Sequence, residues 1–129
     1  MLRFSVASMY NAKLLEHFQN PRNVGELEPA PGVVRVEMTN PACGDIMRLS
    51  ARFRDGIVED VKYKVRGCTA SIAAGSVLTE LMMGAPRATL AAIRASDIDA
   101  ALGGLEPASK HAAILCVDAV KRLLEAHRV

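Results

Sequence analysis

The chain has no tryptophan, and aromatic residues make up only 4% of its 129 residues. Its 16 basic and 14 acidic side chains leave a net charge of +2, so no excess of one sign predicts a nucleic acid or an anionic membrane as a partner. Uninterrupted apolar runs stay far below the roughly 18 residues that a membrane-spanning helix requires. Half of the residues are apolar, however, which excludes intrinsic disorder and predicts a core of aliphatic side chains and methionine.

The sequence also lacks internal repeats, low-complexity tracts and long polar linkers. Its length is that of one domain with its own core, so residues 1–129 are expected to form a single domain. The opening stretch is too short and too polar for a secretory signal peptide. We therefore expect residues 1–8 to be frayed and the protein to be cytoplasmic.

Cysteine is scarce as well, with only Cys43, Cys68 and Cys116 present. An odd number cannot pair completely within one chain, and without an export signal a disulfide framework is not expected. Free thiols, metal ligands or a nucleophile are the remaining interpretations. Cys68 follows Cys43 by 25 positions, which is no recognised zinc-binding spacing.

Three stretches of alternating apolar and polar residues predict strands, over 34–39, 47–54 and 58–65. Asp55-Gly56 predicts a tight hairpin between the last two. Val58 is expected to pair with Phe53 across this turn, but it has the wrong parity to share a face with Val61. A bulge near Glu59-Asp60 would restore the register.

Apolar residues at helical spacing and helix-capping signals predict the helices, over residues 10–19, 69–83, 86–94 and 107–127, with a short capped one that begins at 96–99 and is ended by Gly103-Gly104. Proline and glycine predict a loop over 22–32. This order of elements predicts an α+β domain, with helices packed on one face of a small antiparallel three-stranded sheet. Arginine and lysine side chains are expected on the other face, where they are solvated or receive an acidic partner.

Two cysteines lie at element boundaries beside glycine. Cys43 lies in the turn between two strands, with the Asp45 carboxylate two positions away. Cys68 follows Gly67 and directly precedes a helix, whose N-terminal dipole stabilises a thiolate. A thiolate binds metal or attacks sulfur, whereas the alternative for each cysteine is a small buried hydrophobe.

The last helix carries two further candidates. His111, in its first turn, could be a ligand, a general base or a solvated side chain. Cys116 lies in mid-helix between two aliphatic residues and fits a plain core position. No phosphate-binding glycine loop, nucleophile elbow or HExxH motif is present.

Four parts of the sequence resemble the NifU/IscU-type iron–sulfur cluster scaffold family: Tyr10, NPRNVG at 20–25, NPACGD at 40–45, and Gly67-Cys68. The similarity runs from Tyr10 to the last helix. It implies a SufE/NifU-like fold, in agreement with the α+β prediction. No long insertion separates Cys68 from the last helix, so the chain resembles the IscU branch more than the zinc-dependent SufU branch.

The resemblance implies a site of three cysteines, an aspartate and a histidine at one end of the molecule. Matching motif positions assigns Cys43, Asp45, Cys68 and His111 to this site. The family's third cysteine is expected directly after the histidine, where this chain has an alanine.

Cys116 is four residues beyond that alanine, Ala112, and therefore shares its helix face about one turn further on. Side chains on a helix lean toward its N-terminus, so we expect Cys116 to supply the third sulfur ligand. The competing interpretation places Cys116 in the core, with His111 completing the site.

The resemblance further implies a scaffold rather than an enzyme. Such a protein accepts sulfur from a cysteine desulfurase together with iron, builds a [2Fe–2S] cluster and transfers it to apo iron–sulfur acceptor proteins, with Asp45 as the labile ligand. Isolated protein is expected to be able to carry Zn²⁺ at this site.

Two alternatives stay open. One is a zinc-bound sulfurtransferase that accepts persulfide without building a cluster, and the other is a binding module for the desulfurase alone. The segment that an Hsp70-type chaperone recognises in the family is altered here at residues 105–109, which weakens the expectation of that partner.

Overall fold

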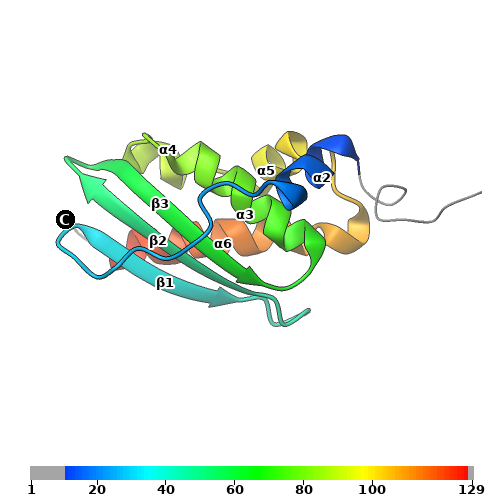
Figure 1. Ribbon diagram of the computed structural model, residues 1–129, viewed down its shortest axis with the longest axis horizontal. Helices are drawn as coiled ribbons and strands as arrows, with labels where there is room; N and C mark the ends of the chain where they lie inside the picture. Colours follow the sequence, from blue (N-terminus) through cyan, green and yellow to red (C-terminus); the bar gives the residue numbers. More distant parts are fainter. Residues whose placement is uncertain (1–10, 128–129) are drawn as a thin grey trace, which may run out of the picture.

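The computed structural model describes residues 11–127, so the expectation of a frayed segment at 1–8 and the motif residue Tyr10 lie outside the described part. Figure 1 shows a three-stranded sheet with helices against it. The elements in chain order are α2 (Ala12–Gln19), β1 (Val33–Thr39), β2 (Ile46–Arg54), β3 (Ile57–Arg66), α3 (Thr69–Met82), α4 (Arg87–Ala91), α5 (Ala95–Ala101), the 3₁₀ turn η1 (Pro107–Ser109) and α6 (His111–Ala126).

The sheet is antiparallel with strand order β1-β2-β3, as predicted. Phe53 pairs with Val58, whereas the preceding residue Arg52 pairs with Asp60. Glu59 is therefore the extra residue of a bulge, which confirms the register predicted from side-chain parity. The bulge allows Val58 and Val61 both to be buried.

Two long helices cover one face of the sheet: α3 packs against β3, and α6 packs against β1 and β2. The close approach of α3 depends on Gly75, since a Cβ there would lie 2.3 Å from Cε2 of the buried Tyr63. The Tyr63 hydroxyl donates to the carbonyl of Ile72 at 2.6 Å and so ties β3 to α3. The burial of Tyr63 and this hydrogen bond show how closely α3 packs against the sheet.

Two helix boundaries differ from the prediction. Helix α4 is shorter than predicted, at Arg87–Ala91, and α6 begins only at His111. Pro107 starts a separate 3₁₀ turn, in which Ser109 N–H donates to the Glu106 carbonyl at 2.8 Å. Proline favours the first turn of a helix, but here the tighter turn ends before α6 begins.

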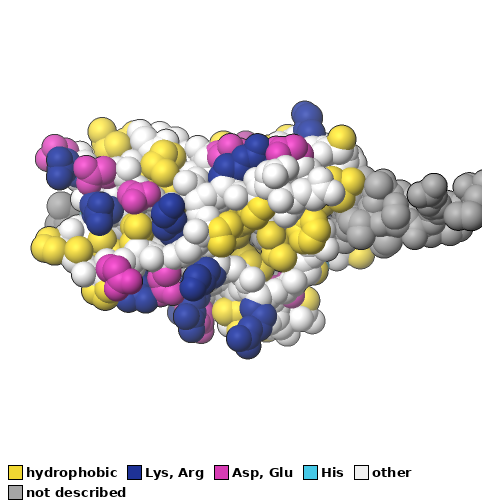
Figure 2. All heavy atoms as spheres, viewed as in Figure 1, with side chains coloured by type: hydrophobic (Ala, Val, Ile, Leu, Met, Phe, Trp, Pro, Cys, Tyr) yellow, Lys and Arg dark blue, Asp and Glu magenta, His cyan; other side chains and the backbone are white. Residues whose placement is uncertain are grey.

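The second face of the sheet is only partly solvated. Val24 forms a parallel bridge with Tyr63, and the backbone N–H of Leu27 donates to Ser50 Oγ at 3.0 Å, so the segment before β1 crosses this face. Arg48 and Lys64 remain exposed beside it. In the view of Figure 2, lysine and arginine side chains are interspersed with acidic ones. None of the helices within residues 11–127 is long and apolar enough to cross a membrane.

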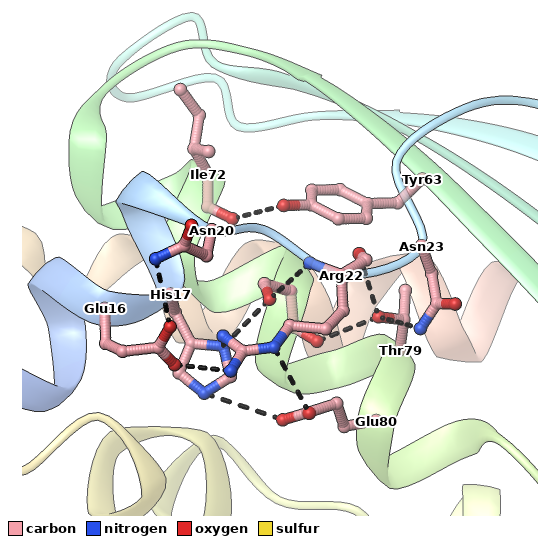
Figure 3. Close-up of polar contacts among 10 residues, drawn as sticks. Glu16, His17, Asn20, Arg22, Asn23, Tyr63, Ile72, Thr79 and Glu80 are labelled. Carbon is pink, nitrogen blue, oxygen red and sulfur yellow. Dashed lines mark hydrogen bonds and ion pairs between the residues drawn. The ribbon is translucent and has the colours of Figure 1, made fainter.

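The NPRNVG segment fastens the N-terminal part of the chain to α3 (Figure 3). His17 Nδ1 lies 2.8 Å from Ser76 Oγ and 3.2 Å from Arg22 Nη1. Because a guanidinium only donates, Nδ1 is an acceptor and the proton lies on Nε2, which faces Glu80 at 3.5 Å. Asn23 Nδ2 adds a bond to Thr79 Oγ1 at 3.1 Å. In this structure the motif therefore holds the fold together away from the cysteines.

Candidate functional site

The candidate site lies where several element ends meet. In an antiparallel sheet the end of β1, the start of β2 and the end of β3 fall on the same edge, and α3 and α6 both begin there (Figure 1). The turn at 40–45 carries Cys43 and Asp45, the β3–α3 junction carries Cys68, and α6 starts with His111. Topology thus brings together residues that are up to 68 positions apart, from Cys43 to His111.

Asn40 holds the 40–45 turn closed. Its Oδ1 accepts the N–H of Ala42 at 2.9 Å, its backbone carbonyl accepts the N–H of Gly44 at 2.8 Å, and its own N–H donates to the Asp45 carbonyl at 2.8 Å. Gly44 has φ +79°, a conformation that residues with a Cβ resist. The turn therefore presents Cys43 to solvent, where its side chain is exposed.

Asp45 points inward and is only 7% exposed. Its Oδ2 accepts the Ser71 hydroxyl at 2.7 Å and the Cys68 backbone N–H at 3.3 Å. Burial alone would raise the pKa of Asp45, but the hydrogen bonds from Ser71, Cys68 and Cys43 together lower it, so the carboxylate is ionised at neutral pH. Gly67 makes room for it, because a Cβ at 67 would lie 2.4 Å from Asp45 Cγ.

His111 presents one specific nitrogen to the site. Its Nδ1 lies 3.1 Å from the carbonyl of Ala108, which can only accept, so Nδ1 carries the proton. Nε2 then lies 3.5 Å from Cys68 Sγ and 3.4 Å from Asp45 Oδ2, and in the neutral imidazole it carries the lone pair that a metal would bind. A carbonyl on the far nitrogen is the usual arrangement that orients a metal-binding histidine.

The ligand atoms of Cys43, Asp45 and His111 all lie within 4.8 Å of one another. The Cys68 thiol adjoins this group through His111 and also lies 3.4 Å from Ser71 Oγ. Thiolate, imidazole and carboxylate are donors for zinc and for iron–sulfur clusters. The structure thus brings together four of the five residues named from the sequence.

Cys116 is not part of this grouping. Its side chain lies in mid-helix of α6 and is 0% exposed, and burial raises the pKa of its thiol. The pKa of the neighbouring Tyr63 is raised by burial and, to a smaller extent, by the Coulombic effect of Cys116. Ala112 is also 0% exposed. The two residues do share a helix face, but that face is turned to the core.

Two residues of the site escaped the sequence reasoning. Ser71 links Asp45 and Cys68, and its position three residues after Cys68 on a helix was a usable signal, since such residues share a face. Asn40 closes the cysteine turn, and Asn-Pro is a known turn-initiating pair. Both act on ligand-bearing loops rather than as evident ligands.

Comparison with known proteins agrees with the motifs. The family model described as NifU-like N terminal domain matches residues 9–128. Iron-sulfur cluster assembly scaffold protein IscU 1 of Archaeoglobus fulgidus is 40% identical over 116 residues, covering 90% of this chain and 74% of that protein. Iron-sulfur cluster assembly scaffold protein IscU of Haemophilus influenzae is 41% identical over 114 residues, covering 87% of this chain and 90% of that protein.

Solved structures support the fold. The crystal structure of FiSufU from the thermophile Fervidobacterium islandicum AW-1 superposes with a TM-score of 0.73 at 20% identity, covering 93% of this chain and 99% of that one. A NifU-like protein (N-terminal) from Brucella abortus gives 0.59 at 24% identity, covering 94% and 90%. With the family model matching nearly its whole length, the chain belongs to the NifU-like N-terminal domain family.

Proposed function

We propose that this chain is a scaffold on which an iron–sulfur cluster is assembled before delivery to other proteins. The observation that carries the proposal is the meeting of Cys43, Asp45 and His111 within 4.8 Å, with the Cys68 thiol 3.5 Å from His111 Nε2. Relatives about 40% identical to the chain are named iron–sulfur cluster assembly scaffold proteins, which supports the same role.

The donor count fits a [2Fe–2S] cargo. Such a cluster is held by four protein ligands, and imidazole replaces thiolate in some natural centres. Cys43, Cys68, His111 and Asp45 supply four donors without Cys116. We therefore favour the interpretation in which Cys116 is a core residue and His111 completes the site.

The four donors are held to different degrees. Asp45, Cys68 and His111 are buried or partly buried and hydrogen-bonded to the protein, whereas Cys43 is exposed on its turn. A carboxylate binds cluster iron less firmly than a thiolate, so Asp45 would be the first ligand to exchange when the cluster leaves. The site is thus built to hold its cargo and to give it up.

The partners follow from this role. Sulfur would come from a cysteine desulfurase, with the exposed Cys43 thiol within its reach, and apo iron–sulfur proteins would receive the cluster. Handover through an Hsp70-type chaperone would have to use segment 105–109, in which Leu105 and Ser109 are buried. Only the three residues between them are exposed for such a contact.

A zinc-bound sulfurtransferase is the second candidate. One imidazole, one carboxylate and two thiols also match the tetrahedral donor set of Zn²⁺, and the family's third thiol position is occupied by Ala112. Zinc in isolated protein would fit either function, so its presence alone does not discriminate.

Anaerobic reconstitution separates the two. Incubation with ferrous iron, cysteine, a desulfurase and a thiol reductant, which reduces the delivered persulfide sulfur to sulfide, should give visible charge-transfer absorption and acid-labile sulfide equimolar with iron. Transfer of that cluster to an apo-ferredoxin should then restore the acceptor's spectrum. A protein that takes up persulfide sulfur but stays colourless, with or without zinc, would contradict the scaffold proposal and support the sulfurtransferase.

A further inference from the structure

Ser71 lies in the first turn of α3 and is 0% exposed. A serine within a helix often returns its hydroxyl to a backbone carbonyl one turn back. The Ser71 hydroxyl instead donates to Asp45 Oδ2 at 2.7 Å, and the Cys68 thiol approaches the same hydroxyl oxygen at 3.4 Å. Ser71 therefore joins two ligand-bearing segments from inside the protein.

The contacts of the Asp45 carboxylate gather on one oxygen. Besides the Ser71 hydroxyl, Oδ2 accepts the Cys68 backbone N–H at 3.3 Å. The same oxygen lies 3.4 Å from the candidate ligand atom His111 Nε2. A hydroxyl–carboxylate bond of 2.7 Å is short and charge-assisted. A carboxylate oxygen that accepts these hydrogen bonds donates less electron density to a metal. Residues that bond to a metal ligand change its affinity for the metal in this way.

We propose that Ser71 is a positioning residue for cluster release, because its hydroxyl engages Asp45 Oδ2 and so keeps the carboxylate from binding the cargo through both of its oxygens. The inference rests on the proposed scaffold function. Ligation through one carboxylate oxygen is weak and exchanges readily, so Ser71 keeps Asp45 labile. Without the hydroxyl, both oxygens can turn to iron, and the cluster is held more firmly.

Cluster transfer from reconstituted protein to an apo-ferredoxin tests the release step. Ser71→Ala should slow transfer about tenfold, on the scale expected for losing a hydrogen bond to a charged group. Ser76→Ala is the matched control, because Ser76 is equally buried on the same helix but binds His17 and Arg22. Its transfer rate should match that of the parent.

A double variant shows whether Ser71 acts through Asp45. Asp45→Ala alone should slow transfer, and adding Ser71→Ala should slow it no further, because the carboxylate that Ser71 orients is gone. Two slow-downs that multiply would overturn the proposal. Ser71→Thr and Ser71→Val differ in the hydroxyl but match in shape, so Thr should transfer faster than Val, and equal rates would also overturn it.

Cobalt binding gives a readout that needs no cluster. Bound Co²⁺ absorbs strongly when four-coordinate and weakly when a second carboxylate oxygen raises the coordination number. Ser71→Ala should weaken the visible d–d bands, whereas Ser76→Ala should leave them unchanged. An unchanged cobalt spectrum in Ser71→Ala refutes the positioning role. Failure of the parent protein to assemble a cluster would refute the scaffold function instead, and the cobalt spectra would still decide on Ser71.

Discussion

Gly67→Ala would test how tightly the candidate site is built. The added Cβ would lie 2.4 Å from Asp45 Cγ and 2.7 and 2.8 Å from its two oxygens. Carbon atoms pack at about 3.5 Å or more, so the carboxylate would have to retreat by roughly 1 Å. That movement breaks its bonds to Ser71 and to the Cys68 N–H, each worth about 1.5–3 kcal/mol when the acceptor is charged.

Two effects oppose each other in this variant. Gly67 lies outside the left-handed region of backbone space, so alanine carries no conformational strain and restricts the unfolded chain, a gain of about 0.4–1 kcal/mol. We expect the free energy of unfolding to fall by about 2–5 kcal/mol after this offset. Urea denaturation followed by far-UV circular dichroism measures it.

The control is the same substitution in an Asp45→Ala background, where the atoms that Cβ meets are gone. There Gly67→Ala should be neutral or slightly stabilising, which gives a coupling free energy of at least about 2 kcal/mol. Equal costs in both backgrounds would refute the steric argument, and with it the close packing of Asp45 on the Gly67-Cys68 backbone.

Three further outcomes are expected. Asp45→Ala should slow cluster transfer to an acceptor, and an unchanged rate would remove Asp45 as the labile ligand. Cys116→Ala should lower the free energy of unfolding by about 1 kcal/mol as a core truncation, yet assemble and hold a cluster as well as the parent; a cluster restored only by Cys116→Ala/Ala112→Cys would instead support the shifted-ligand interpretation. Asp45→Asn should reduce the pH dependence of the free energy of unfolding of the metal-free protein. The pKa of Asp45 is lower in the folded than in the unfolded state, so its contribution to stability is present above about pH 4 and is lost as the pH falls through the folded-state pKa. Identical pH profiles of parent and variant would contradict this.

Local patterns predicted most of the fold because the sheet depends on them. The bulge at Glu59 followed from parity alone, since Val58 and Val61 must both reach the core. The start of α6 did not follow, because both a 3₁₀ turn and an α-helix accept Pro107 at their beginning. Short-range preference does not choose between them, whereas tertiary contacts do.

The candidate site, too, has one part that local sequence predicts and another part that depends on tertiary structure. Cys43 and Asp45 belong to one local turn, but the approach of Cys68 and His111 depends on the chain's return to the same sheet edge. Spacing on α6 correctly put Ala112 and Cys116 on one face. Spacing could not show that this face packs on the sheet, which removes Cys116 from solvent. The orientation of a helix about its axis is set by the core as a whole.

The loss of the third thiol has an electronic consequence for the proposed cargo. Two thiolates, one carboxylate and a neutral imidazole give a ligand set one unit less negative than four thiolates would, and less negative surroundings raise the reduction potential of a cluster. His111→Cys should restore that charge and lower the potential by on the order of 100 mV, since paired imidazoles raise it by several times that amount in natural centres. Protein-film voltammetry on the reconstituted parent and variant measures the difference. His111→Ala serves as the control, because it removes the donor without adding charge. A potential that does not move in His111→Cys would show that Nε2, although aimed at Cys68 and Asp45, is not bound to the cluster.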